Sequence, residues 1–566
     1  MTKLRRYLAP AAFVALLLVL HVRALLAHME KASDPYFFND DARIQIFPFF
    51  RYSEPAAFAN DYLGDYALAL LPTGYRALYW LGAHTVDAFT LSKILPYPMF
   101  LFTVVLVTLV AYRIGRYPAA FVAATIVLGS NLYIERITGG LPRSFGYPLA
   151  AAALFALAWG RWRWLAATTV IGAAFYPTLG LFSGLLLTLW MLVAPAEDRG
   201  DAKDLTLKQR FVVLASTAAV SAVLLIPPSL GSAEFGPRIT GRHFKIYPEA
   251  GPGGLSSAED RPPFSAVLPS VSSFMERAVV GSGAAWWPWL SDKLTGLKMI
   301  VVDTFLLVGF FGAFVLARRR DDVRRLALFP IAGIIGHLFA RGFAPYLYGP
   351  NRFVLYTVPL LFAVVCGIGL VGFVERFLPR LDDLRKAAAA GGLALLFMLM
   401  IGGHGHKSAG LSFGLGPAQQ KLANAVAELP EDALVGGWPD DPMSNVPLVS
   451  RRRALITGEM HIAFHVAYLE QMRVRMRALI AAYYARSAEP IEKLRDELGV
   501  THLIVNKGHL TGPAPGYATP YGGWIQAAVA RDKGKPYYLL THLGALAVYQ
   551  DPQFAILDLS RIPATP

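Results

Sequence analysis

Two adjacent carboxylates are the part of the sequence best suited to chemistry. Asp40 and Asp41 stand in the segment 34–45 (DPYFFNDDARIQ), among aromatic residues. Neighbouring side chains of a helix or turn point in different directions, so the two acids need not share one role. One can act as a general base toward an acceptor hydroxyl, while the other orients the acceptor or binds a divalent cation. The alternative is an Asn-Asp N-cap for the following helix.

Basic residues in three other loops are candidates for binding a phosphate. Arginine binds phosphate oxygens through paired hydrogen bonds and keeps its charge at a membrane interface. The simpler alternative is that these side chains reach lipid headgroups or pair with nearby acids. We predict that a lipid-linked phosphate is bound by Arg143, Arg352, Arg341, Arg242, His243 and Lys245. Residues predicted to contact the substrate beside them are Arg43, Glu135, Tyr348 and Asn351.

The composition determines which elements can position these residues. Hydrophobic residues make up 55% of the 566-residue chain and charged residues 16%, whereas soluble proteins carry about 25% charged residues. This composition excludes a water-soluble enzyme, and the single cysteine, Cys366, excludes an internal disulfide. Apolar runs near the length of a spanning helix, about 20 residues, predict about 11 transmembrane helices. They lie near 8–27, 95–112, 117–134, 144–160, 164–178, 179–195, 211–229, 298–317, 326–340, 353–373 and 388–403.

The charge distribution predicts the orientation of these spans. The stretch 66–92 is interrupted by Pro72, Gly74, Arg76 and Asp87, and we interpret it as helices along the membrane surface. With a cytoplasmic N-terminus, the cytoplasmic loops then hold +11 of the net charge of +14, as the positive-inside rule requires. The basic excess therefore records topology and does not indicate nucleic acid. We expect a multi-pass protein of the cytoplasmic membrane whose first span is retained, although a cleaved signal peptide is the alternative.

In this topology the candidate residues all lie on the outer face. The outer segments are 28–94, 135–143, 230–297, 341–352 and everything from about 404. We predict two domains: a polytopic region over 1–403 and an extracytoplasmic soluble α/β domain over 404–566. In the second domain the residue pattern predicts helices at 419–429, 461–486 and 491–498 and strands at 433–437 and 501–506, with a closing hairpin of 537–540 and 545–549.

This arrangement resembles the GT-C superfamily of integral-membrane glycosyltransferases. Asp40 and Asp41 stand where that superfamily places an acidic motif in the first outer loop, and 66–92 stands where it has juxtamembrane helices. The C-terminal stretches RMRALIAAYYA and LRDELGVTHLIVN look like the tails of bacterial members. The Trp-Trp-Asp motif of oligosaccharyltransferases is not matched, because Trp286-Trp287 is followed by Pro288.

The resemblance implies a function. It implies transfer of a sugar from a polyprenyl-phosphate-linked donor to a glycan, lipid or protein acceptor, with Asp40 or Asp41 as general base and outer-face arginines on the phosphate. Metal dependence varies in the superfamily, so a divalent cation at Asp40 and Asp41 is an open alternative. The competing hypotheses are a transporter or flippase for lipid-linked saccharides and a non-catalytic scaffold of envelope polysaccharide assembly. An enzyme predicts that Asp40 or Asp41 lines one outer cavity, open laterally to lipid, together with at least one outer-loop cation: Arg143, Arg238, Arg242, His243, Arg341 or Arg352.

Overall fold

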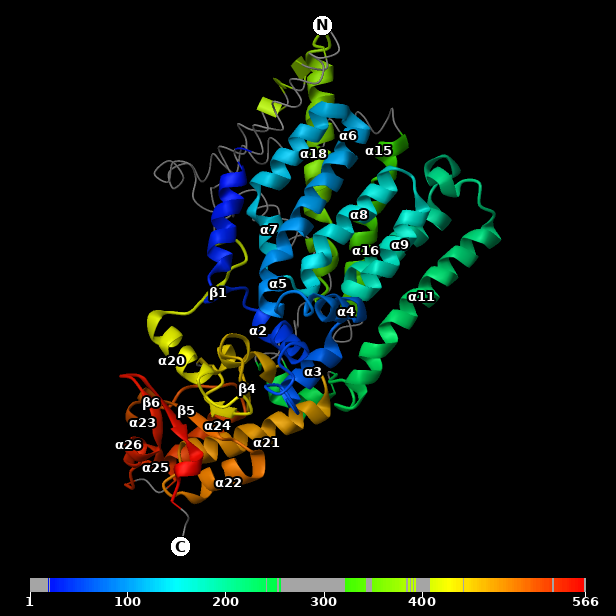
Figure 1. Ribbon diagram of the computed structural model, residues 1–566. Helices are drawn as coiled ribbons and strands as arrows, with labels where there is room; N and C mark the ends of the chain where they lie inside the picture. The colour runs from blue at the N-terminus through cyan, green and yellow to red at the C-terminus, as the bar shows by residue number, and fades with distance from the viewer. Residues whose placement is uncertain are drawn as a thin grey trace.

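The structure is a computed structural model, mainly helical with a small mixed sheet (Figure 1). Long helices gather at one end of the molecule, and the sheet with its short helices lies at the other. The residues that the structure describes are 19, 21–240, 242–251, 254–255, 321–342, 349–382, 385–386, 388–389, 391–392, 408–440, 442–531 and 534–563.

A bundle of apolar helices forms the first part of the fold. Within it α6 packs on α8 and α18, and α9 packs on α8, α10 and α11. Among the described residues, four helical stretches are long and apolar enough to cross a membrane: 88–129, 207–233, 323–342 and 352–377. The bundle helices are α6 (Pro96–Gly129), α7 (Asn131–Ile137), α8 (Gly146–Ala158), α9 (Trp162–Phe175), α10 (Pro177–Thr188), α11 (Leu207–Ala233), α16 (Leu328–Gly342), α17 (Arg352–Leu355) and α18 (Val358–Phe377).

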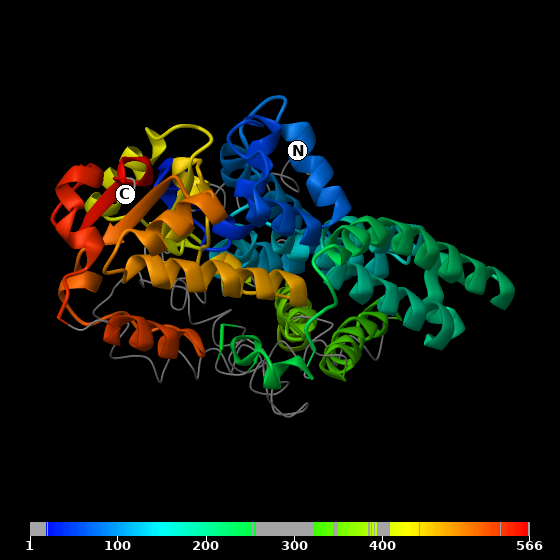
Figure 2. The same cartoon turned by 90° about the horizontal axis from the view of Figure 1, so that it is seen from below.

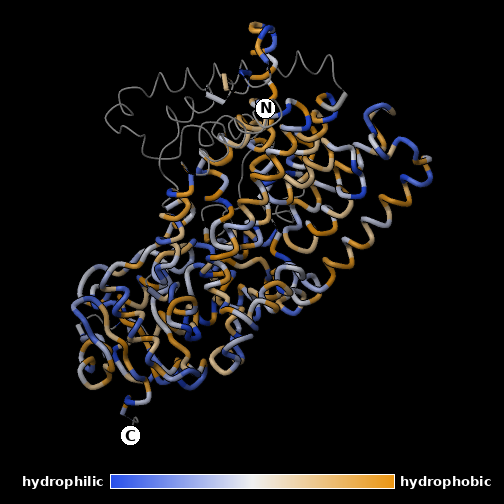
Figure 3. The backbone as a smooth tube through the Cα atoms, turned by 45° about the horizontal axis from the view of Figure 1, so that its top comes forward, coloured by the Kyte–Doolittle hydropathy of each residue, from blue (hydrophilic) through white to orange (hydrophobic). Residues whose placement is uncertain are grey.

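These helices coincide with most of the predicted spans, but several are short. Element α6 contains two predicted spans, because the backbone leaves helical geometry at Gly115 and Arg116 between them. Helices α8, α9 and α10 have only 12 to 14 residues. The predicted span 298–317, and most of 8–27 and 388–403, lie outside the described residues. Apolar side chains exposed on α6, α11 and α16 suit contact with lipid, and Figure 3 shows hydrophobic residues concentrated along these helices.

The stretch predicted to lie along the surface forms three short helices. They are α3 (Tyr62–Leu70), α4 (Thr73–Gly82) and α5 (Ala88–Ile94), the last leading into α6. Helices α3 and α4, with 9 and 10 residues, are about half as long as a spanning helix. Stacked rings hold them: Phe49 lies 4.5 Å from Tyr79, and Tyr66 lies 3.5 Å from Tyr468, between ring centroids.

The C-terminal part contains a five-stranded sheet in the order β4-β3-β5-β7-β6. Strands β4 (Arg453–Ala454), β3 (Leu434–Gly437) and β5 (His502–Asn506) are parallel, whereas β7 (Phe554–Asp558) and β6 (Ala547–Gln550) are antiparallel to their neighbours. The helices of this part include α20 (Pro417–Ala427), α21 (Val466–Tyr483), α22 (Glu489–Leu498) and α24 (Tyr521–Ala530). This α/β organisation agrees with the sequence prediction except at the closing hairpin.

The predicted hairpin was wrong in one of its strands. Residues 538–540 belong to the one-turn helix α25 (Tyr538–Thr541), whose N-cap is Tyr537, and the partner of β6 is β7. The turn between β6 and β7 is fixed by Asp551, whose carboxylate accepts the backbone N–H groups of Gln553 and Phe554 at 2.8 and 2.7 Å. An aspartate that accepts backbone N–H groups two and three residues on favours a tight turn at that position.

The two hydrophobic cores of the molecule do not follow the predicted domain boundary near residue 404. One core lies in the helix bundle, within 99–371. The other combines the C-terminal part with residues 38–89 and 235–250. Strand β1 (Phe37–Phe38) pairs antiparallel with β2 (Phe413–Gly414), directly before the acidic pair. Viewed from below, the blue N-terminal segment lies between the orange and red C-terminal elements and green α11 (Figure 2). The acidic segment therefore lies against both parts.

Candidate functional site

The acidic pair stands at the start of a four-residue helix, α2 (Ala42–Gln45). Asp41 is at the N-cap position, but its side chain makes no capping hydrogen bond. Instead, the Asn39 Oδ1 atom accepts the backbone N–H of Asp41 at 3.1 Å. The N-cap interpretation therefore does not account for the Asp41 carboxylate, which is directed to another partner.

That partner is Arg143, one of the predicted phosphate ligands. Its Nε atom lies 2.9 Å from Asp41 Oδ2, and its Nη2 atom donates to Asn39 Oδ1 at 2.7 Å. Asn39 is buried, and its Nδ2 atom donates to the Gly410 carbonyl at 2.7 Å. The side chain of Asp41 is 41% exposed and that of Arg143 16%. A ligand can therefore reach this pair, although its frame is buried.

A glycine turn positions Arg143. Gly139 and Gly140 have φ angles of +100° and +60°, in the left-handed region that favours glycine. The hydroxyls of Tyr75 and Tyr79 both donate to the Gly140 carbonyl, at 3.0 and 2.8 Å. Arg143 follows in the 3-10 helix η2 (Pro142–Phe145). One helix of the 62–94 stretch, α4, thus holds this turn through two hydrogen bonds, as expected if the helix positions the site.

Arg352, the first residue of α17, lies near the same region. Its guanidinium carbon lies 6.0 Å from the centre of the Tyr176 ring, and both Arg352 and Arg143 act electrostatically on the Tyr176 hydroxyl. That hydroxyl is buried beside Tyr356, and it makes no hydrogen bond of ordinary geometry to the described residues; neither does Oδ1 of Asn351. Two predicted phosphate ligands, Arg143 and Arg352, thus stand near this buried hydroxyl.

Asp40 belongs to a second cluster, reached from the C-terminal part. Arg43 forms an ion pair with Asp40 and, through its Nη2 atom, a second one with Glu459 Oε1 at 2.7 Å. The guanidinium lies 4.2 Å from the centre of the Phe413 ring. Burial raises the pKa of Glu459 above its ordinary value, Arg43 opposes this, and the charges of Asp40 and Asp41 add to it. The two adjacent acids therefore have different arginine partners.

Of the other predicted residues, those that the structure describes form no ion pair with Asp41. Arg242, His243 and Lys245 lie at the 3-10 helix η5 (His243–Lys245), in a segment held against the C-terminal part. In that segment the Ile239 N–H donates to the Phe464 carbonyl at 2.9 Å, and Tyr247 donates to Glu470 at 2.5 Å. Arg341 lies in the last turn of α16, the Glu135 side chain is exposed on α7, and Tyr348 lies outside the described residues.

The side chains around Asp40 and Asp41 do not form a set of metal ligands. Within the described ranges, no three His, Cys, Asp or Glu side chains are grouped as a metal site would require. Each of the two carboxylates is engaged by a different arginine. We therefore assign no step to a divalent cation.

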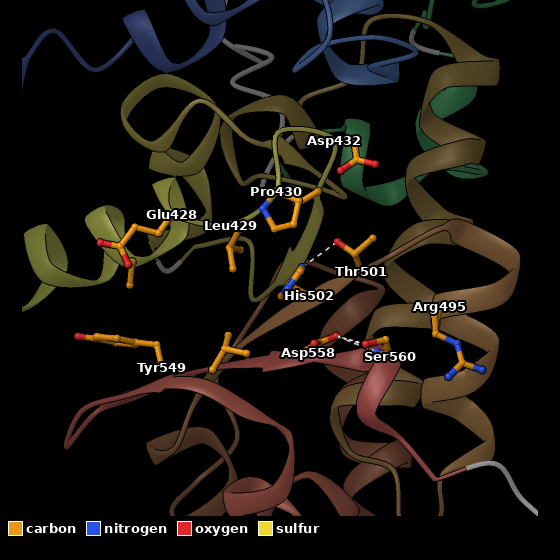
Figure 4. A pocket seen from close by; sticks show the side chains of 13 residues that line it. Glu428, Leu429, Pro430, Asp432, Arg495, Thr501, His502, Tyr549, Asp558 and Ser560 are labelled. Carbon is orange, nitrogen blue, oxygen red and sulfur yellow. Dashed lines mark hydrogen bonds between the residues drawn. The ribbon is translucent and has the colours of Figure 1, made fainter.

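A cavity of about 610 Å³ in the C-terminal part is a separate feature (Figure 4). Its polar groups largely satisfy one another: Asp558 accepts from the N–H and hydroxyl of Ser560 at 3.0 and 2.7 Å, and His502 Nδ1 lies 2.9 Å from the Thr501 hydroxyl. None of its lining residues belongs to the predicted site. The candidate centre therefore remains at Asp41 and Arg143.

Three residues of this region were missed from the sequence. Asn39 precedes the acidic pair, and its place in the same polar run was the available signal. Tyr176 and Glu459 stand far from the acidic pair in sequence, in stretches without an unusual motif, and gave no signal.

Comparisons with known proteins identify the fold. No protein-family model matches the chain, and no curated protein matches it in sequence. In structure it matches ArnT from Cupriavidus metallidurans, a GT-C glycosyltransferase, in the apo state and bound to undecaprenyl phosphate. Both matches have a TM-score of 0.52 and 14% identity, and cover 97% of this chain and 99% of that chain. The chain has the GT-C fold.

A second GT-C structure matches over a smaller share of its own chain. The Archaeoglobus fulgidus oligosaccharyltransferase in complex with zinc and sulfate gives a TM-score of 0.47 at 12% identity, covering 87% of this chain and 68% of that chain. The predicted resemblance is confirmed for the fold, and the match to ArnT extends the GT-C fold over almost the whole chain.

Proposed function

We propose that the protein transfers a sugar from a polyprenyl-phosphate-linked donor to an acceptor, with Asp41 and Arg143 at the centre of the reaction. The observation that carries the proposal is the 2.9 Å contact between these two side chains in a chain with the GT-C fold. ArnT, which has this fold, has been seen with undecaprenyl phosphate, and this supports a lipid-linked phosphate as the donor group here.

In the proposed reaction Arg143 exchanges its partner. Before the donor binds, Asp41 neutralises Arg143. The donor phosphate, a diester with one negative charge, then takes over the Arg143 guanidinium, with Arg352 and the Tyr176 hydroxyl as further hydrogen-bond donors. This exchange leaves the Asp41 carboxylate free to act as a base, so donor binding and base activation are coupled.

The chemical step is a displacement at the anomeric carbon. An acceptor hydroxyl oxygen attacks that carbon, Asp41 takes the hydroxyl proton, and the bond from the carbon to the phosphate oxygen breaks. The electron pair of the broken bond leaves with the polyprenyl phosphate, where Arg143 and Arg352 stabilise the charge. Asp40, held by Arg43, has no direct role in this scheme.

We further propose that the reaction takes place on the outer face of the cytoplasmic membrane, with about 11 spans and with residues 404–566 extracytoplasmic. The positive-inside distribution of charge supports this topology. The sugar is a hexose or a pentose, and the acceptor is a glycan, a lipid or a protein.

The test is transfer by purified protein from a panel of labelled polyprenyl-phosphate sugars to membrane extract. Asp41→Asn should reduce transfer at least about 100-fold, since a general base contributes about 10² to 10⁴ in rate. Asp65→Asn is a matched control. Asp65 is 44% exposed, as Asp41 nearly is, and its carboxylate pairs with a different arginine, Arg51, at 2.7 Å. Full transfer by Asp41→Asn would refute the base assignment. Movement of the donor across vesicles without transfer would favour a flippase.

A further inference from the structure

The guanidinium of Arg43 joins the acidic segment to the C-terminal part. The side chain is only 9% exposed, and its Nη2 atom bonds both Asp40 and, at 2.7 Å, Glu459. Its Nη1 atom also lies 3.5 Å from Asn445 Oδ1. Glu459 and Asn445 both come from the C-terminal part, more than 400 residues along the chain from Arg43. Two of the three side chains that bond Arg43 are therefore supplied by that part.

The turn that carries Glu459 is fixed on every side. It is the 3-10 helix η10 (Glu459–His461), which packs against α2. His461 lies between two tyrosine hydroxyls, 2.8 Å from that of Tyr517 and 3.0 Å from that of Tyr521. The hydroxyl of Tyr468 donates to the Met460 carbonyl at 2.7 Å. These bonds fix the position of the Glu459 backbone, as a residue that orients others requires.

The same contact reaches the turn before α2. The backbone N–H of Asp40 donates to the hydroxyl of Ser412, at 3.2 Å, and β1 pairs with β2 just before it. Asp41 follows Asp40 directly and is the first residue of the α2 cap. Any rotation of this turn changes the direction of the Asp41 carboxylate, and a displacement of about 1 Å in a reacting group can cost about 100-fold in rate.

We propose that Glu459 is a positioning residue of the transfer centre. Its carboxylate holds Arg43, Arg43 holds Asp40, and the turn is thereby fixed with the Asp41 carboxylate toward Arg143. The C-terminal part then completes the centre. This proposal rests on the proposed function, because Glu459 acts only by orienting Asp41, the proposed base. The charged groups facing Glu459 are Arg43, Asp40, Asp41 and Asp440.

The test compares Glu459→Gln with Glu54→Gln in the full-length protein. Glu54 is a matched control, because its carboxylate also pairs across the two parts, with Arg451, and its side chain is 34% exposed against 24% for Glu459. Two measurements are made on each variant: steady-state transfer over a range of donor concentration, and hydrogen exchange of the backbone amides at 39–45. The second measurement needs no substrate.

We expect Glu459→Gln to lower kcat about 10-fold to 100-fold with little change in KM for the donor, since Glu459 does not touch the phosphate. Amides 39–45 should exchange faster. Glu54→Gln should show none of these changes.

The outcomes separate the two proposals. Unchanged kcat and unchanged exchange in Glu459→Gln would overturn the positioning role, whatever Asp41→Asn does. If Asp41→Asn keeps full transfer while exchange at 39–45 rises in Glu459→Gln, the base assignment fails, and Glu459 then holds the turn without serving catalysis. Faster exchange with unchanged kcat would also overturn the positioning role.

Discussion

Replacing Gly140 with alanine tests how the fold places Arg143. A Cβ atom at this position would lie 2.8 Å from the Tyr79 hydroxyl oxygen and 2.9 Å from both the Cα and the carbonyl oxygen of Ser92. The Ser92 contacts are with backbone, so the turn itself must shift. An alanine in the left-handed region costs about 1–2 kcal/mol. Overpacking against fixed atoms adds about 1–3 kcal/mol. The expected loss of stability is therefore about 2–5 kcal/mol.

Gly499 provides the matched control for this substitution. Its φ angle is +71°, but a Cβ atom there would meet nothing within 4 Å. Alanine at Gly499 should cost only the conformational term, about 1–2 kcal/mol. Thermal unfolding in detergent compares the two variants, and donor transfer is measured on both. We expect Gly140→Ala to have the lower Tm and to lose transfer, and Gly499→Ala to keep it. Equal Tm and equal transfer would refute the argument that close packing at Gly140 sets the position of Arg143.

Three further predictions concern single side chains. Arg143→Lys should lower kcat/KM for the donor about 10-fold to 100-fold, because one ammonium cannot replace a guanidinium that contacts both Asp41 and Asn39. Steady-state transfer measures kcat/KM, and an unchanged value would count against the prediction. Tyr176→Phe should leave Tm unchanged or higher, since it removes a buried hydroxyl that makes no hydrogen bond of ordinary geometry to the described residues, yet weaken polyprenyl phosphate binding several-fold; a fall in Tm with unchanged binding would contradict this. Burial raises the pKa of Asp61 from 3.8 to about 6. Ionised Asp61 therefore lowers the stability of the folded state by about 3 kcal/mol. This loss of stability is absent below pH 3.8, grows as the pH rises and is complete above pH 6. Asp61→Asn should therefore raise Tm at pH 7 but not at pH 3.5, and a gain at both values would show that ionisation is not the cause.

Much of the fold could be predicted because apolar length and loop charge are local properties of the sequence. The helices near 211–229, 326–340 and 353–373, and the strands at 433–437 and 501–506, follow from such patterns. The hairpin prediction failed at 537–540 because the pattern there, an apolar run beside aromatics, is compatible with a strand or a short helix. The pairing partner of β6 was decided by the turn at Asp551.

The residues that the structure brings together at the candidate site could be predicted in part, for a related reason. Asp41, Arg143 and Arg352 could be found because ionisable residues beside apolar runs are unusual enough to require an explanation. The separation of Asp40 and Asp41 into two arginine clusters depends on which residues of the C-terminal part reach α2, and these include Glu459 and Asn445. Contacts over more than 400 residues leave no periodic signal in one sequence. The basic residues of 242–245 have the right composition, but the residues directly after them, Ile246 and Tyr247, bond to Arg473 and Glu470 of α21.

The central claim is that Arg143 binds the donor phosphate and Asp41 serves as the base. The most direct test of these two separate roles is the binding of a polyprenyl phosphate without its sugar, measured on Asp41→Asn and Arg143→Gln. We predict that Asp41→Asn binds at least as tightly as the natural protein, because the competing carboxylate is gone. Arg143→Gln should bind at least about 10-fold more weakly, since it loses a charged hydrogen-bond donor. Weaker binding by Asp41→Asn together with unchanged binding by Arg143→Gln would contradict the account.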